Sequence, residues 1–272
     1  MSALRIVSAR REHHSDVARL FPELGVDDPV PEAARWWNEM APDTLFIEDV
    51  GRVVAYGYAQ APSTLGYVRH VIVDPARRGE GLGRRLMHAL AQHLRESGCE
   101  RWQLNVLVDN ATALALYRSL GLAIDFHTWV VRLPPEKITA LPRANAIDVV
   151  ATLEADDAAL EREFEIAPGL LTMFRGKPEH VLVTAVERAS GTRVGFAHFD
   201  PLFPGCWPIR ARRAEHARAL LEALMPHFPA GKPCFQLVIE RDEALATAML
   251  AAGGMLRHSI AHMEGPLPTR RA

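Results

Sequence analysis

The sequence predicts an α/β fold that is built twice along one chain. In both halves, short runs typical of strands alternate with longer amphipathic runs of helical period. A second observation is a constant offset, since Tyr117 and Gly121 have counterparts in Met249 and Gly253, each 132 residues further along. A Pro-rich stretch between the halves disfavours both helix and central strand. The expected parts are a first domain, a linker and a second domain, at residues 1–133, 134–145 and 146–272.

The elements of the first half follow from hydrophobic period and turn residues. Asp49-Val50-Gly51 joins two apolar runs and predicts a hairpin. Gly98 ends a long helical pattern as its C-terminal cap. In order, we expect a strand at 4–7, helices around 17–21 and 36–40, strands at 45–47, 53–58 and 67–73, a helix from 82 to 97, a strand at 102–108, a helix that ends at 121, and a strand at 126–133.

The second half repeats this order, with its own hairpin turn at Ser190-Gly191. A repeat of this length predicts two similar domains rather than a solenoid of short units. The expected elements are a strand at 147–150, a helix at 156–164, strands at 180–187 and 192–199, a helix at 214–225, a strand at 235–240 and a helix at 242–252.

Composition excludes several classes of protein. The chain of 272 residues has a formal net charge of −2 and a sequence pI of about 6.6, whereas a general nucleic-acid binder is usually basic. Its three cysteines have no pairing spacing, which predicts a reducing compartment. The N-terminus lacks the pattern of a signal peptide, and no apolar run is long enough to span a membrane. We therefore expect a cytoplasmic protein without a nucleic-acid or membrane partner.

The most informative run is Arg77-Arg78-Gly79-Glu80-Gly81-Leu82-Gly83, between a strand pattern and a helix pattern. Glycines let main-chain N–H groups approach an anion closely, and the helix that follows directs its unpaired N–H groups at the same place. Arg77 and Arg78 add positive charge at the mouth. The spacing is neither the dinucleotide fingerprint nor a P-loop. A plain tight turn is the alternative.

This run resembles the pyrophosphate loop of the GNAT superfamily of acyl-CoA N-acyltransferases. The family pattern is Gln/Arg-x-x-Gly-x-Gly/Ala, and Arg78, Gly81 and Gly83 match it. The resemblance implies two tandem GNAT-like α/β (α+β) domains, each a mixed, mostly antiparallel twisted sheet flanked by helices, with acetyl-CoA as cosubstrate. It places the following residues at the cofactor: Val71, Val73, Arg78, Gly79, Glu80, Gly81, Leu82, Gly83, Arg84, Asn110 and Tyr117.

A second motif, Asn110-x-x-Ala113-x-x-x-Tyr117-x-x-x-Gly121, resembles the family's helix after the fifth strand. By this resemblance Tyr117 is the general acid, and a phenol can donate to a departing thiolate. The alternative is a core tyrosine on the apolar face of the helix. Asn110 lies near the cofactor by resemblance, and Asn also favours helix N-caps; the two roles are compatible.

The general base is open. Resemblance places it on the fourth strand, on a face that simple alternation assigns to Tyr67, Arg69, Val71 and Val73. Many relatives carry Glu or His there, whereas this chain has Tyr67 and Arg69, and we include Tyr67 as a second catalytic residue. A water relay, Glu32 or no base at all are the alternatives. His70 is expected on the other face as a packed side chain.

The second half has lost the residues of this chemistry. The segment 208–213 contains no glycine, and Met249 stands where the first half has Tyr117. Methionine has no proton to donate. Arg210, Arg212 and Arg213 form a basic run that either contacts a phosphate or is a solvated surface.

These observations lead to one principal hypothesis and two rivals. The principal hypothesis is an N-acetyltransferase that transfers an acetyl group from acetyl-CoA to a primary amine by direct attack, with a small-molecule acceptor and no metal. One rival is a non-catalytic acyl-CoA-binding or interaction module. The other is an acetyltransferase that acts on a protein amine. The chain is expected to be a monomer or a homodimer.

Overall fold

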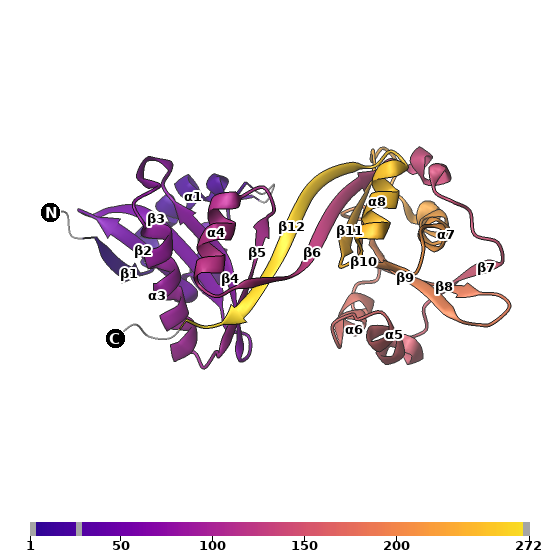
Figure 1. The fold of residues 1–272 in the computed structure, drawn as a ribbon, viewed down its shortest axis with the longest axis horizontal. Coiled ribbons are helices and arrows are strands. Elements are labelled where there is room, and N and C mark those ends of the chain that lie inside the picture. The colour runs from indigo at the N-terminus through magenta and orange to yellow at the C-terminus, as the bar shows by residue number, and fades with distance from the viewer. Residues whose placement is uncertain (1–3, 26–28, 269–272) are drawn as a thin grey trace. The chain divides into compact units, whose positions relative to one another are not determined.

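The computed structural model describes residues 4–25 and 29–268, and it divides into two compact units. The first unit consists of Met1–Asp125 together with Ala261–Ala272, and the second of Phe126–Ile260. Figure 1 shows the elements of each unit, coloured along the chain. The polypeptide therefore leaves the first unit, forms the second, and returns to the first.

The first unit is built on a mixed sheet. Its elements are β1 (Arg5–Ser8), α1 (His14–Leu20), α2 (Ala33–Arg35), the π-helical turn η3 (Trp36–Met40), β2 (Thr44–Asp49), β3 (Arg52–Gln60), β4 (Leu65–Val73), α3 (Leu82–Glu96), β5 (Arg101–Leu107), α4 (Ala111–Ser119) and the start of β6 (Ala123–Leu133). The strands β1 to β4 are consecutive antiparallel neighbours. β5 pairs with β4 in parallel, which requires the crossover helix α3 between them.

Helices cover both faces of this sheet (Figure 1). On one face, Leu90 of α3 and Leu114 of α4 share a buried core with Trp102 of β5. On the other face, Val17 of α1 and Trp36 form a second core. The leucines of α3 recur at helical spacing, so one side of this helix is buried along its whole length.

The second unit repeats this plan. Its elements are β7 (Ile147–Ala151), α5 (Asp157–Glu163), α6 (Leu170–Arg175), β8 (Val181–Glu187), β9 (Arg193–Asp200), β10 (Gly205–Ala211), α7 (Ala214–Leu224), β11 (Phe235–Glu240) and α8 (Glu243–Ala251), followed by β12 (Met255–Pro266). The strand order is β7-β8-β9-β10-β11, and only β10 and β11 are parallel. Helices α7 and α8 cover one face, and α5 and α6 the other.

The last strand of each repeat is exchanged. β6, which follows the first repeat, pairs antiparallel with β11 of the second unit over the register Leu133↔Phe235 to Thr128↔Glu240. The part of β12 that belongs to the first unit lies next to β5, where Ala261 and Met263 are fully buried in the core under α3. The β12 backbone passes so close to the end of α4 that a Cβ on Gly265 would lie 2.4 Å from the Gly121 carbonyl oxygen.

This arrangement differs from the expected division at residues 133 and 146. Residues 126–133 belong to the second unit, and the first unit is completed by residues from the end of the chain. The expected linker also differs, since η6 (Pro135–Ala140) is a 3-10 helix with proline at its start, where the missing N–H costs nothing. Ile138 is only 2% exposed and is part of the second unit's core.

The internal repeat is confirmed by matching cap geometry. Asn110 accepts a hydrogen bond from the Ala113 amide at the start of α4, and Asp242 accepts one from the Leu245 amide at the start of α8, 132 residues later. Both helices end in a left-handed glycine, Gly121 and Gly253.

Within the described residues, no helix is both long and apolar enough to cross a membrane.

Candidate functional site

The sheet of the first unit opens between β4 and β5. Registered parallel pairing runs from Leu65↔Arg101 to Val68↔Leu104 and then stops, although both strands continue. Val71 and Val73 remain paired with β3 on one side only. The backbone of β4 beyond Val68 is thus available to another extended chain on its β5 side.

The loop between β4 and α3 presents free amides. It runs over residues 74–81, and Gly79 and Gly81 have φ values of 85° and 76°, a conformation that glycine adopts without strain. No side chain caps α3, and the first helical bond to this loop is from the Arg85 amide to the Gly81 carbonyl. Among the described residues, the N–H groups of residues 79–84 therefore have no acceptor. Together with the dipole of α3, they form a site suited to an anion.

Neighbouring side chains hold the loop in place. Asp74 accepts a hydrogen bond from the Ala76 amide and is paired with Arg19, and these donors lower the pKa of its carboxyl group. Gly83 has a different role from the two left-handed glycines. A Cβ there would lie 3.3 Å from Leu116 of α4, so its small size lets α3 and α4 pack closely.

The two arginines expected at the mouth of the loop are paired. Arg77 contacts Glu80 and Asp49, each at 2.7 Å, and Arg78 contacts Glu23 at 2.6 Å. Both were expected to add positive charge at the mouth; the Arg77 charge is paired, and its guanidinium holds the loop between two carboxylates. Arg78 has a half-exposed side chain, and its ion pair can exchange for a phosphate at small cost. Glu80 points its carboxylate at Arg77 rather than into the loop.

A basic groove continues from the loop along α3. It has a volume of about 610 Å³ and is lined by Gly81, Arg84, Arg85 and His88, with Ile6 and Pro268 among its other walls. Arg85 donates to the Leu4 carbonyl. Arg84 was expected at the cofactor, and the structure places it beside the free amides.

Tyr117 lies on α4 within the core formed under α3. Its side chain is buried, and burial raises the pKa of its phenol to about 12. The hydroxyl makes no hydrogen bond within the described part of the chain. It belongs to the same cluster as Leu82 at the start of α3, and Val73 of β4 packs against that cluster. Tyr117 is thus a core residue whose hydroxyl proton is not donated to another group of the described chain. The two interpretations of the sequence, a core tyrosine and a proton donor, are therefore compatible.

A β-bulge at Arg69 changes which residues of β4 share a face. Tyr58 of β3 pairs with His70 and the next residue, Ala59, pairs with Val68, so Arg69 is an extra residue. Val71 therefore packs under α3, whereas Arg69 and His70 face the opposite side. The expected face of Tyr67, Arg69, Val71 and Val73 is wrong, because simple alternation does not allow for the bulge.

A cavity on that opposite side collects titratable groups. It has a volume of about 810 Å³ and is lined by Phe21, Glu32, Arg35, Glu39, Tyr58, Gln60, Arg69 and His70, among others. Burial, with a contribution from the Arg69 charge, lowers the pKa of His70 to about 4, so this imidazole is neutral at pH 7. Its Nδ1 is buried and has no partner among the described residues. Glu39 is paired with Arg35, whereas the Glu32 carboxylate makes no ion pair within the described ranges.

Tyr67 is part of a polar network at the point where β4 and β5 separate. The Arg69 guanidinium lies 4.0 Å from the centre of its ring, and the Asn105 amide donates to its hydroxyl at 2.9 Å. Asn105 is also 2.8 Å from Nδ1 of His262, a residue of β12. Asn105 and His262 were not expected here; a contact across 157 residues leaves no local signal in the sequence.

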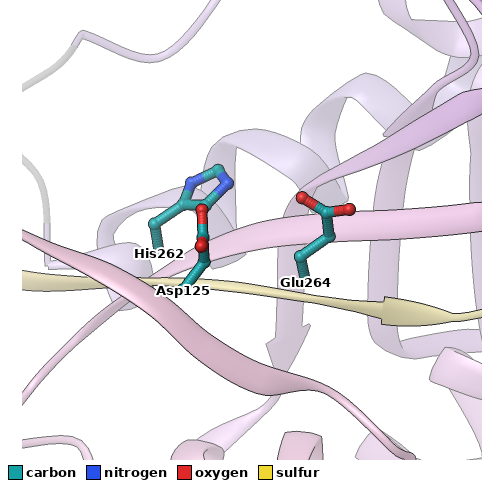
Figure 2. Close-up of side chains that lie close together, drawn as sticks. All are labelled: Asp125, His262 and Glu264. Atoms are coloured by element: carbon teal, nitrogen blue, oxygen red, sulfur yellow. The ribbon is translucent and has the colours of Figure 1, made fainter. Parts of the chain in front are cut away.

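Strands β6 and β12 together carry a group of side chains of the kinds that bind metals. Asp125, His262 and Glu264 have ligand atoms within 4.8 Å of one another, and Figure 2 shows the carboxylate of Asp125 beside the His262 ring. Each is already engaged: both ring nitrogens of His262 contact amide oxygens, and Glu264 pairs with Arg101 at 2.7 Å. We assign no metal to this group, and the expectation of a reaction without a metal stays a prediction.

The second unit differs at the corresponding place. The loop from β10 to α7 has only Arg212 and Arg213, where the first unit has eight residues. The opening between β10 and β11 is bridged, because Glu240 accepts a hydrogen bond from Trp207 at 3.0 Å and pairs with Arg210 at 2.7 Å. Arg212 and Arg213 are paired with Glu163 and Glu215, which leaves no free cationic patch. Met249, in the position of Tyr117, is fully buried.

Known proteins resemble part of this chain in sequence. A model described as the Acetyltransferase (GNAT) family matches residues 11–122. The N-alpha-acetyltransferase RimI of Mycobacterium tuberculosis is 39% identical over 112 residues, which cover 38% of this chain and 68% of that protein. The chain belongs to the GNAT acetyltransferase family. Acetyl-CoA is the cosubstrate of enzymes in this family.

Other GNAT relatives match less of their own length. A mycothiol acetyltransferase of Nocardiopsis dassonvillei is 34% identical over 124 residues, which cover 42% of this chain and only 37% of that protein. The chain thus matches about a third of the length of such relatives.

Two solved structures cover nearly the whole chain. A GCN5-related N-acetyltransferase from Sphaerobacter thermophilus has a TM-score of 0.69 at 19% identity, over 98% of this chain and 97% of that one. A tandem GNAT protein from the clavulanic acid biosynthesis pathway has a TM-score of 0.61 at 16% identity, over 99% and 100%. At these identities the likeness concerns the fold, and it confirms the predicted tandem GNAT architecture.

Proposed function

We propose that this chain is an N-acetyltransferase that transfers an acetyl group from acetyl-CoA to a primary amine, and that the first unit alone carries the reaction. One observation supports this most strongly. A loop with two left-handed glycines and a run of free amides lies where β4 leaves β5, and the second unit has no such loop. The residues fit the cosubstrate, because free amides and a helix N-terminus suit a pyrophosphate.

The other residues of the first unit have roles that follow from their positions. The backbone of Val71 and Val73 would bind the extended arm of the cosubstrate through its unpaired edge. Arg84 and Arg78 would neutralise phosphate charge at the loop. Asn110 holds the start of α4 through its N-cap bond and so positions Tyr117 on the same helix.

Tyr117 is proposed to donate to the departing thiolate. Its raised pKa, about 12, means that the phenol stays protonated throughout the neutral and alkaline range. A phenol less acidic than a thiol of pKa about 8.5 stabilises the developing thiolate by a hydrogen bond and is a poor source of complete proton transfer. Tyr67, whose hydroxyl already accepts from Asn105, is proposed to orient groups at the strand opening.

The acceptor amine is proposed to enter through the 810 Å³ cavity. Glu32 is the carboxylate there without an ion pair in the described chain, so it can bind an ammonium group or take its proton. The neutral His70 can accept a hydrogen bond from the amine without repelling its charge. A cavity of this size suits a small molecule.

A protein N-terminus is the second candidate acceptor. The observation in its favour is the 39% identity to a protein named N-alpha-acetyltransferase, of which the matched region covers 68%. A peptide would need to reach the same cavity from solvent.

Initial rates with acetyl-CoA distinguish these proposals. The panel comprises small primary amines and short peptides with free N-termini, and the variants are Glu32→Gln with Glu39→Gln as the matched control. We expect turnover of a small amine, with kcat/KM reduced about tenfold or more in Glu32→Gln and little changed in the control. Turnover of peptides alone would favour the second candidate. Binding of acetyl-CoA without turnover of any amine would favour the non-catalytic module.

A further inference from the structure

The second unit contains a cavity of its own, with a volume of about 390 Å³. Its walls come from α6 and the residues that follow it up to His180, from the end of β9 and the loop after it, and from β10 and β11. Most of them are apolar or aromatic, among them Met173, Phe174, Phe203, Trp207 and Val238. Several are exposed although apolar: Phe203 is 57% exposed and Met173 53%. Large side chains of this kind around a hollow indicate a ligand site rather than ordinary surface.

A chain of hydrogen bonds leads into this cavity. His198 is stacked flat on Phe174, with ring centres 3.6 Å apart, and its Nδ1 faces the Trp207 carbonyl oxygen, so Nδ1 must carry a proton. Burial lowers the pKa of His198 to about 4, and the ring is neutral at pH 7. Its Nε2 is therefore an acceptor, and Nδ1 of His180, 2.7 Å away, must donate to it.

Beyond this bond, His180 faces a carboxylate. Its Nε2 lies 3.5 Å from one oxygen of Asp200. The other oxygen of Asp200 already accepts from the Leu202 and Phe203 amides, which hold the loop. A cationic N–H donor, placed at this edge of the cavity, would pair with the Asp200 carboxylate.

A cation without a partner lies on the same cavity. Lys177 lines it, and its ammonium group makes no hydrogen bond or ion pair within the described residues. Its charge is close enough to disfavour protonation of His198. The cavity thus combines aromatic walls with one carboxylate and one unpaired ammonium group.

We propose that the second unit binds a small zwitterion with an aromatic side chain, of which a free aromatic amino acid is the simplest example. The ring packs against Phe203 and Trp207, the amine donates to Asp200, and the carboxylate pairs with Lys177. This site lies outside the acetyl-transfer site and needs neither its loop nor Tyr117. It gives the second unit, which lacks a cofactor loop, a binding role of its own.

Calorimetric titration of the full chain tests this proposal with four probes. L-phenylalanine has all three groups that the site should recognise. L-phenylalaninamide lacks the carboxylate, 3-phenylpropionate lacks the amine, and L-alanine lacks the ring. We expect saturable binding of about one equivalent of L-phenylalanine. Each of the other probes should bind at least about tenfold more weakly than L-phenylalanine. The proposal is overturned if L-phenylalanine does not bind saturably, or if its amide and 3-phenylpropionate bind as tightly as L-phenylalanine itself. This test needs no variant that might misfold.

Variants assign the site. Lys177→Gln should weaken L-phenylalanine about tenfold and leave L-phenylalaninamide unchanged, because only the former has a carboxylate to lose. Asp200→Asn, which keeps an acceptor for the loop amides, should weaken L-phenylalanine and leave 3-phenylpropionate unchanged. Gly81→Glu and Glu32→Gln are the controls, and neither should alter these affinities. An effect of Glu32→Gln with none of Lys177→Gln would place the amino acid in the first unit and refute the site in the second.

Discussion

The two units share one strand order and differ where the fourth strand of each repeat meets the helix that follows. In the first unit eight residues with two left-handed glycines lie between β4 and α3, and the neighbouring strand separates. In the second, two arginines join β10 to α7, and Glu240 bridges the opening through Trp207 and Arg210. The comparison teaches that the same architecture offers an anion site only where the loop is long enough and has glycines whose neighbouring amides are free.

The two units are more alike in the cavity that each has beside its third and fourth strands. Both units keep a cavity bounded by the ends of their third and fourth strands, about 810 Å³ in the first and about 390 Å³ in the second. Each contains a buried histidine with a lowered pKa, His70 and His198. The repeat has therefore diverged more at the proposed cofactor side than at the proposed ligand side.

The largest effect should come from a charge in the loop. Gly81→Glu places a carboxylate among the free amides, and we expect acetyl-CoA affinity to fall about 1000-fold, measured by calorimetry. Gly81→Ala isolates the conformational cost, since a Cβ there meets nothing within 4 Å and only the left-handed φ is strained, by about 1 kcal/mol. Arg213→Glu is the matched change in the second unit and should leave the affinity unchanged. If Arg213→Glu were the damaging variant, the assignment of the two units would be reversed.

Removal of the proposed donor should have the next largest effect. Tyr117→Phe should lower kcat about 100-fold with little change in acetyl-CoA affinity, because the phenol acts on the departing thiolate. Met249→Leu in the second unit should change neither quantity.

The pH profile gives an independent check on Tyr117. Its pKa is raised to about 12, so the donor form persists at every pH up to 10, and the wild type should show no alkaline loss of kcat from this group. A loss below pH 10 that disappears in Tyr117→Phe would contradict the buried, protonated phenol.

Exchange of the last strands predicts a crossed pattern of destabilisation. Met263→Ala, near the end of the chain, should destabilise the first unit by about 3 kcal/mol, and Leu133→Ala should destabilise the second, since both side chains are fully buried. Hydrogen–deuterium exchange by mass spectrometry reads the two units separately. If Met263→Ala instead sped up exchange in β11 and not in β5, the end of the chain would belong to the second unit. The domain division at residues 133 and 146 would then be correct.

The smallest effect concerns acid stability. The pKa of His70 is lowered to about 4 in the folded state, whereas an unfolded histidine titrates near 6.5. The unfolded state therefore binds more protons between these values, and stability is lost as the pH falls from 6.5 to 4, by at most about 3 kcal/mol. His70→Phe should reduce this loss in the first unit, as measured by urea unfolding at pH 7 and pH 5. An unchanged loss would mean that His70 is not held neutral.

Features that depend on residues close together in the sequence could be predicted. The loop at residues 79–83 and the helix of Asn110 and Tyr117 depend on local backbone preference, and their positions in the structure agree with it. The bulge at Arg69 could not be predicted, because it depends on pairing with β3, and it moved Arg69 and His70 to one cavity.

The exchanged strands could not be predicted for a further reason. β6 and β12 follow equivalent helices, with equivalent glycine caps at Gly121 and Gly253. Two strands with the same local pattern can complete either sheet, and only the packing of side chains such as Met263 decides between them. The network of Tyr67, Asn105 and His262 includes a residue of β12. It could therefore not be predicted without knowing which sheet β12 completes.

Titration of the full-length chain with acetyl-CoA by calorimetry tests the central claim most directly. One working loop and one bridged counterpart predict a single equivalent of acetyl-CoA per chain, abolished by Gly81→Glu. Two equivalents, or one equivalent that survives Gly81→Glu, would contradict the claim that only the first unit holds the cosubstrate.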